Sequence, residues 1–152
     1  MINHVSFCAN IIKLRSSGFI PEIGLILGSG LGSFAQQVEV TSKISFEDLP
    51  GFPEAGVGGH AGQLILGHIK GTKVAILQGR AHYYEHGKAD AMSVAIRTLK
   101  EIGCQSLVLT NAAGAINTNV SPGDLMLITD HINMTGVSPL FGETGNDRFV
   151  DM

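Results

Sequence analysis

Short apolar runs, each about the length of one β-strand, recur along this chain and limit what it can fold into. Examples are "IGLIL" (residues 23–27), "SLVLT" (106–110) and "DLMLITDHI" (124–132). Continuous apolar runs of this length, bounded by turn residues, are typical of strands that are buried on both faces. The stretch "GQLILGHIKGTKVAILQG" (62–79) predicts two further strands, joined by a hairpin turn at residues 70–73.

Helical periodicity occurs in two other segments. Apolar residues recur at helical spacing before Gly18, and again over residues 88–102. Strands that alternate with helices, together with one hairpin, predict an α/β fold with a mixed central β-sheet flanked by helices. A chain of 152 residues can bury a core of its own, so we expect a single domain over residues 1–152. The fold is expected to be truncated, because residues 133–152 are polar and turn-rich and add no closing helix or strand.

Composition excludes several classes of protein. With 44% hydrophobic and 15% charged residues, the chain is expected to be globular rather than disordered. Its net charge of −3 and lack of a basic run argue against nucleic acid or a membrane as a partner. Cys8 and Cys104 have no CxxC partner, and Lys13 and Arg15 follow the first apolar residues, unlike the order in a signal peptide. We therefore expect free thiols and a cytoplasmic location.

Two of the predicted strands run directly into glycine-rich or small-residue loops. In open α/β sheets, ligands bind at the carboxyl ends of strands. The loop "GSGLG" (28–32) would let the backbone approach a ligand closely, and Ser29 adds a hydroxyl group. The loop "TNAAGAIN" (110–117) has small residues, and Ala112 could present its backbone N–H to an anion. By itself, each loop would also be explained by a plain tight turn.

A third strand end carries the densest group of polar side chains, in "VAILQGRAHYYEHG" (74–87). Arg80 can hold a phosphate through two parallel hydrogen bonds. In an extended chain, Arg80, His82 and Tyr84 would lie on one side and form a single polar wall. His60, in "GGHAG", could add a donor to the same anion site. The alternative is that these side chains only decorate surface loops.

A different chemistry is also compatible with this segment. His82 and His86 fit the H-x-x-E-H pattern of a zinc hydrolase. That pattern requires both histidines on one face of a helix, and the flanking glycines leave little room for one. Arg80 would also place a positive charge beside the metal. A zinc hydrolase that uses His82 and His86 is therefore the less favoured alternative.

Five motifs, in their order and spacing, resemble those of the trimeric purine nucleoside phosphorylases of the inosine–guanosine–xanthosine type. They are "LGSGLG", "GGHAG", "QGRAHYYE", "TNAAG" and "DHIN". Methylthioadenosine phosphorylases share that fold, but "HYYE" is closer to the purine nucleoside branch. The resemblance covers almost the whole chain and implies the N-terminal half of such an enzyme, with a phosphorylase/hydrolase-like fold. This family is a group of pentosyl-transferring glycosyltransferases of purine salvage. Its members convert a purine (deoxy)ribonucleoside and orthophosphate, as co-substrate, into free base and (deoxy)ribose 1-phosphate, and they use no metal or organic cofactor.

The resemblance also implies roles for particular residues. Arg80 and His82 are the implied catalytic residues, Tyr84 lies against the ribose, and Phe149 reaches into the site of a neighbouring subunit of a homotrimer. The implied phosphate-binding residues are Ser29, His60, Arg80, His82 and the backbone N–H of Ala112.

One departure from the family pattern is large. The family's purine-recognising glutamate and asparagine, a second phosphate-binding serine and a ribose-contacting histidine lie in the C-terminal half, and none of them can be assigned here. Ala81 also stands where many relatives have a bulkier residue. We therefore expect the 152-residue chain to be inactive by itself. An inactive fragment that binds phosphate or nucleoside is the corresponding alternative.

Overall fold

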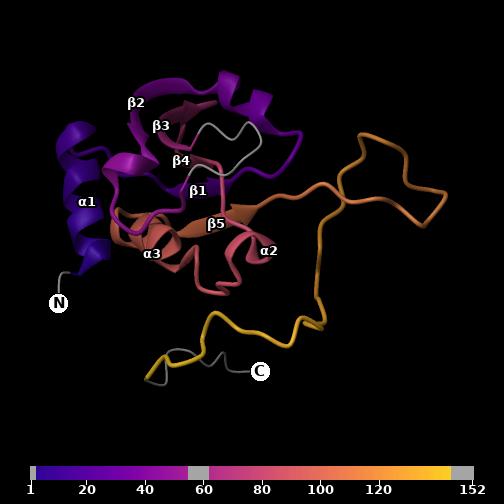
Figure 1. The fold of residues 1–152 in the computed structure, drawn as a ribbon. Coiled ribbons are helices and arrows are strands. Elements are labelled where there is room, and N and C mark those ends of the chain that lie inside the picture. The colour runs from indigo at the N-terminus through magenta and orange to yellow at the C-terminus, as the bar shows by residue number, and fades with distance from the viewer. Residues whose placement is uncertain (1–2, 55–61, 145–152) are drawn as a thin grey trace.

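The computed structural model describes residues 3–54 and 62–144 and contains a five-stranded sheet with the order β2-β3-β4-β1-β5 (Figure 1). The strands are β1 (Ile23–Ile26), β2 (Glu39–Ser45), β3 (Gln63–Ile69), β4 (Thr72–Gln78) and β5 (Ser106–Leu109). The α-helices are α1 (His4–Arg15), α2 (Tyr83–His86) and α3 (Ser93–Glu101). Two 3₁₀ helices, η1 (Gly32–Gln37) and η2 (Phe46–Asp48), flank β2. Among the described helices, none is long and apolar enough to cross a membrane.

The sheet is mixed, as the sequence predicts. β1 pairs in parallel with both β4 and β5. The pairs β2–β3 and β3–β4 are antiparallel. The expected α/β architecture is therefore confirmed, and the sheet has an antiparallel half formed by the hairpin and β2 and a parallel half centred on β1.

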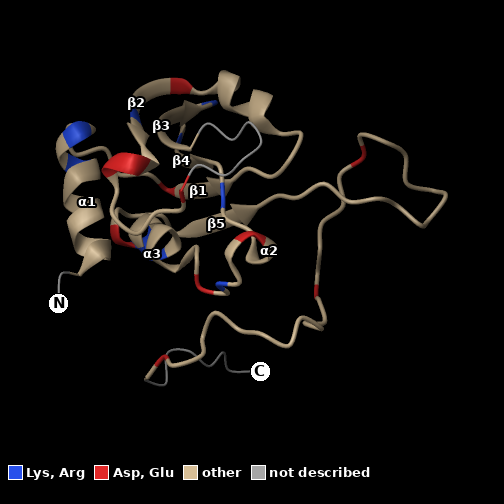
Figure 2. Cartoon of the chain, viewed as in Figure 1, with Lys and Arg blue, Asp and Glu red and all other residues tan. Residues whose placement is uncertain are grey.

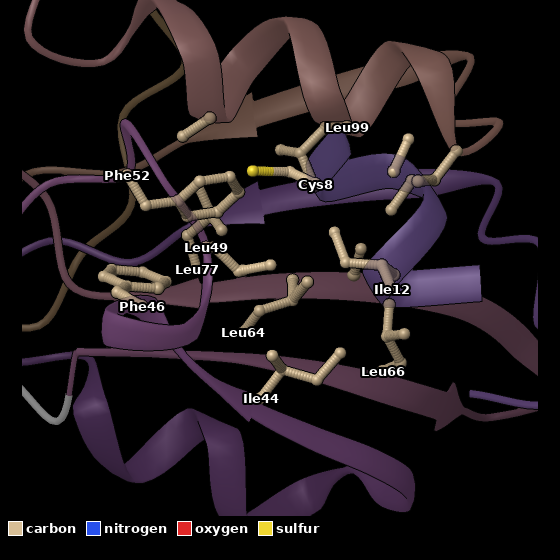
Figure 3. Packing of buried hydrophobic residues seen from close by; sticks show 14 of the residues in the cluster. Cys8, Ile12, Ile44, Phe46, Leu49, Phe52, Leu64, Leu66, Leu77 and Leu99 are labelled. Carbon is tan, nitrogen blue, oxygen red and sulfur yellow. The ribbon is translucent and has the colours of Figure 1, made fainter. Parts of the chain in front are cut away.

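Each face of the sheet is covered by different elements. Leu64 and Leu77 point to one face, where they belong to a core cluster with Ile12 of α1 and Leu99 of α3 (Figure 3). Ile65 lies on the opposite face, in a second cluster to which η1 contributes. Neighbouring residues of one strand enter different cores because side chains alternate along a strand. This explains the apolar runs of β3 and β4, which are buried on both faces. The run that forms β5 was also predicted to be a buried strand, and that prediction is wrong, because β5 is an edge strand of the described sheet and all four of its residues are exposed.

The predicted hairpin between β3 and β4 is confirmed. Its two turn residues, Lys70 and Gly71, have φ angles of +48° and +83°. Two consecutive positive φ angles define a type I′ turn, whose twist matches that of the flanking strands. Ile69 pairs with Thr72, so the turn is shorter than the segment predicted from sequence.

Two elements differ from the sequence-based prediction: one helix is shorter than expected, and one strand was not expected. The helix expected over residues 88–102 is confirmed only as α3, because residues 89–92 form turns before it. Strand β2 was not predicted. Six of its seven residues are exposed or only partly buried, and its pairing shifts register between Val40 and Ser42. An edge strand with so few buried side chains lacks the apolar run by which buried strands are recognised.

The strand predicted at residues 124–132 is wrong. After β5 the chain leaves the sheet, and residues 111–144 form only turns and irregular structure (Figure 1). The side chains of Leu125 and Leu127 are 94% and 89% exposed. An apolar run of this kind becomes a strand only where a ladder partner and cover for both faces exist, and the described residues supply neither. The charged residues of this segment are acidic (Figure 2): Asp124, Asp130 and Glu143.

Both cysteines are free thiols, as expected. Burial raises the pKa of each thiol, and that of Cys104 rises from 9.0 to about 11. At pH 8, a shift of this size lowers the reactive thiolate fraction of Cys104 about a hundredfold. We therefore expect iodoacetamide to alkylate Cys104 about a hundredfold more slowly in the folded protein than in urea, measured by mass spectrometry of the peptide that contains it. Equal rates in the two states would contradict the raised pKa.

Candidate functional site

The three polar loops singled out from the sequence follow three strands that are neighbours in the sheet. β1 lies between β4 and β5, and Ile26 is in register with Leu77 on one side and Leu109 on the other. Because all three strands run in the same direction, their carboxyl ends meet at one edge of the sheet. The three loops therefore start side by side: residues 28–32, the segment that begins at Arg80, and the loop after Leu109.

Thr110 connects these three strand ends through its polar atoms. Its hydroxyl Oγ1 accepts a hydrogen bond from the backbone N–H of Gly28 at 2.8 Å and donates one to the carbonyl oxygen of Ile26 at 3.1 Å. Its backbone N–H also donates to the Ile26 carbonyl oxygen, at 3.1 Å. Its own carbonyl oxygen accepts a hydrogen bond from Nη1 of Arg80 at 2.7 Å. Sequence reasoning placed Thr110 at the end of a strand but missed these contacts.

The first loop lies unusually close to the third. A Cβ atom added to Gly28 would lie 2.4 Å from the carbonyl oxygen of Thr110 and 2.9 Å from Cα of Asn111. Backbone atoms at such distances cannot move aside as the end of a flexible side chain could. Glycine at position 28 is therefore required by contact between two loops, in addition to any approach of a ligand.

Arg80 is held at this edge of the sheet by its hydrogen bond to Thr110. The residue is partly buried, and this bond occupies one of the guanidinium donors. A guanidinium group has five N–H donors in a fixed planar arrangement. Further donors of Arg80 thus remain suited to a planar, bidentate contact with an anion.

The extended wall expected over Arg80, His82 and Tyr84 is wrong in its backbone geometry. The chain turns into α2 at Tyr83, and the backbone N–H of His82 donates to the carboxylate of Glu85 at 2.7 Å. Nevertheless, the rings of His82 and Tyr84 are stacked, with centroids 5.0 Å apart and an angle of 14° between the planes. The two aromatic side chains are therefore together although the chain turns into a helix between them. Tyr84 is 80% exposed, which leaves its ring accessible to a ligand.

The remaining predicted site residues are only partly described. Ser29 and Ala112 are exposed residues of the first and third loops. His60 and Phe149 lie outside the described residues. The structure thus brings together the loops of Ser29, Arg80 and Ala112, with His82 two residues after Arg80.

A pair of glutamines, also missed from the sequence, supports the same edge. Nε2 of Gln63 donates to Oε1 of Gln78 at 2.6 Å, and Nε2 of Gln78 donates to the carbonyl oxygen of Gly32 at 3.4 Å. Gln63 and Gln78 face each other across the hairpin. The hairpin register, extended to its open end, would have predicted this cross-strand pair.

Two other features carry less weight as sites. The described residues contain no group of three or more His, Cys, Asp or Glu that could hold a metal ion, so they offer no ligand set for the zinc alternative. A cavity of about 480 Å³ lies beside η2 and is lined by Phe46, Phe52, Pro53 and neighbouring residues. Its lining includes none of the described residues predicted for the site, so we place the candidate site at the strand ends.

The contact between the first and third loops predicts a selective effect of substitution. Replacing Gly28 with alanine should force the two loops apart and lower the free energy of unfolding by about 1–3 kcal/mol. Gly32→Ala is the matched control, because a Cβ atom there meets nothing within 4 Å and should change stability by less than about 0.5 kcal/mol. Urea denaturation measures both variants. Equal losses would contradict the close contact at Gly28.

Comparison with known proteins gives a consistent result. Residues 22–152 match the family model described as the phosphorylase superfamily. Purine nucleoside phosphorylase 1 of Bacillus subtilis (strain 168) is 49% identical over 135 residues, which cover 87% of this chain and 50% of that protein. The purine nucleoside phosphorylase of Bos taurus is 40% identical over 132 residues, which cover 85% of this chain and 45% of that protein.

Solved structures agree with these relatives. The purine nucleoside phosphorylase of Schistosoma mansoni in complex with acetate superposes with a TM-score of 0.71 at 41% identity, covering 81% of this chain and 45% of that one. A purine nucleoside phosphorylase in complex with ribose-1-phosphate gives a TM-score of 0.70, also at 41% identity, covering 81% of this chain and 45% of that one. The chain spans about half the length of the curated relatives it matches. The resemblance read from the five motifs is thereby confirmed, and this chain belongs to the phosphorylase superfamily.

Proposed function

We propose that this chain forms part of a purine nucleoside phosphorylase, which converts a purine (deoxy)ribonucleoside and orthophosphate into free base and (deoxy)ribose 1-phosphate. The observation that carries the proposal is that Thr110 joins three polar loops at one edge of the sheet. The chain that contains these loops is 49% identical to a purine nucleoside phosphorylase over the matched residues. The enzyme would be a pentosyl-transferring glycosyltransferase of purine salvage.

The phosphate site is proposed to lie between the three loops. Arg80 supplies a permanent positive charge and paired N–H donors, Ser29 a hydroxyl and Ala112 a backbone N–H. These are donor types that bind phosphate tightly without a metal. His82 lies close in the chain to Arg80, and the family resemblance adds His60 from outside the described residues. Orthophosphate is thus a co-substrate, and the proposed reaction requires no metal or organic cofactor.

The ribose is proposed to lie against Tyr84. The Tyr84 ring is fixed by stacking on His82 and is open to solvent on its other side. As the bond between C1′ and the purine nitrogen stretches, its electron pair moves to the base and the sugar becomes oxocarbenium-like. A phosphate oxygen then forms the new bond to C1′, and the purine takes up a proton. Holding the phosphate beneath C1′ supplies orientation, and its charge stabilises the cationic sugar.

The groups that recognise the purine are proposed to lie in the part of the family that this chain does not span. The described residues therefore carry no assignment of base preference. We further propose a cytoplasmic homotrimer, in which Phe149 completes the site of a neighbouring subunit. Free thiols are compatible with a reducing compartment. Light scattering that showed an active monomer would contradict the trimer.

The function is tested with the purified protein at its natural length. Incubation with inosine and excess phosphate should release hypoxanthine and ribose 1-phosphate, and omission of phosphate should stop the reaction. Release of free ribose without phosphate would instead indicate a hydrolase. The 152-residue chain expressed alone should turn over less than about a tenth as fast, because leaving-group assistance is worth about 10²–10⁴ in rate and no residue that the structure describes is assigned to it.

Substitution of Arg80 tests the phosphate assignment. Arg80→Gln should lower kcat/KM for phosphate by about 10²–10³, the usual effect of losing a key donor to a reacting anion. Arg80→Lys should fall between this variant and wild type, because it keeps the charge but loses the paired geometry. Arg15→Gln is the control, because Arg15 is half exposed and pairs with Asp48, and neither residue belongs to the proposed phosphate site. A normal kcat/KM for phosphate in Arg80→Gln would refute the assignment.

A further inference from the structure

We propose that Thr110 is a positioning residue that sets the geometry of the phosphate site without touching the substrate. This inference rests on the proposed function. It goes beyond it by assigning the alignment of the three phosphate loops to one residue. Thr110 is the first residue after β5 and is partly buried, so its polar atoms face neighbouring loops rather than only solvent.

Each polar group of Thr110 contacts a different part of the site. The hydroxyl Oγ1 accepts from the N–H of Gly28, the residue directly before Ser29. The carbonyl oxygen accepts from Nη1 of Arg80. The backbone then continues through Asn111 to Ala112. A shift of Thr110 would therefore move all three proposed phosphate donors relative to one another.

The hydroxyl group is the part of this arrangement that depends on the side chain. Oγ1 donates to the carbonyl of Ile26 and accepts from the N–H of Gly28. It therefore links the end of β5 both to the end of β1 and to the start of the first loop. Without it, the Gly28 N–H loses its acceptor, and the loop that carries Ser29 loses its link to β5. Serine preserves both hydrogen bonds, whereas valine preserves only the shape of the side chain.

The inference is tested at the natural length of the protein with Thr110→Val and the matched variant Thr110→Ser. Phosphate binding is measured by titration calorimetry, and steady-state KM is measured for phosphate and for inosine. We expect Thr110→Val to weaken phosphate binding about tenfold, as for a partly buried N–H, that of Gly28, left without its acceptor, with KM for inosine changed less than twofold. Thr110→Ser should stay within twofold of wild type.

A double-mutant cycle separates positioning from a general loss of stability. If Thr110 acts through the Ser29 loop, Thr110→Val should weaken phosphate binding much less in a Ser29→Ala background. The inference would be overturned if the two substitutions had additive effects on phosphate binding, or if Thr110→Ser weakened that binding as much as Thr110→Val does. It would also be overturned if Thr110→Val raised KM equally for phosphate and for inosine. Absence of phosphate binding by the wild-type protein would overturn the proposed function as well, whereas normal binding by Thr110→Val would overturn this inference alone.

If Thr110→Val fails to fold, hydrogen exchange of the wild-type protein decides the question. The Gly28 amide should be protected in the free protein, because it donates to Oγ1, and saturating phosphate should slow its exchange further. An exchange rate at Gly28 that phosphate leaves unchanged would show that the Gly28–Thr110 link is not coupled to the site.

Discussion

Parallel pairing of β1 with both β4 and β5 is the constraint on which the rest of the structure depends. It places the ends of three strands at one edge of the sheet, with Ile26 opposite Leu77 and Leu109. The loops after these strands need only a few residues each to reach a common ligand. A strand inserted between β1 and β4 would separate Arg80 from the glycine loop by one further strand spacing, about 4.8 Å, which exceeds the length of a hydrogen bond.

The two halves of the sheet have different tasks. The hairpin of β3 and β4 contributes the fully buried Leu64 and Leu77, which tie the sheet to α1 and α3. The parallel half contributes the loops, and its edge strand β5 is exposed along its whole length. Rigidity from the hairpin reaches the site through β4, which ends at Gln78, two residues before Arg80. The contact of Gln78 with Gly32 extends that support to the first loop.

The sequence was sufficient for elements whose signals are local. The apolar run before Gly28, the hairpin turn at Gly71 and the family motifs all predicted features that the structure or the comparisons confirm. Features set by distant partners were not predictable in the same way. Residues 124–132 have the composition of a buried strand but lack a partner in the described chain, and β2 becomes a strand only through pairing with β3. The hydrogen bonds of Thr110 depend on register between strands, which no single-sequence pattern encodes.

The position of β1 in the sheet has a consequence for how the chain folds during synthesis. Ile23 must pair with Val74 and with Ser106, both of which are made much later than β1 itself. At roughly 5–20 residues per second, β1 waits on the order of seconds on the ribosome with its apolar residues unpaired. The β3–β4 hairpin can close within about 1–10 μs of its own completion. The hairpin can therefore form first, β1 can then add to β4, and β5, whose partner in the described sheet is β1, joins last.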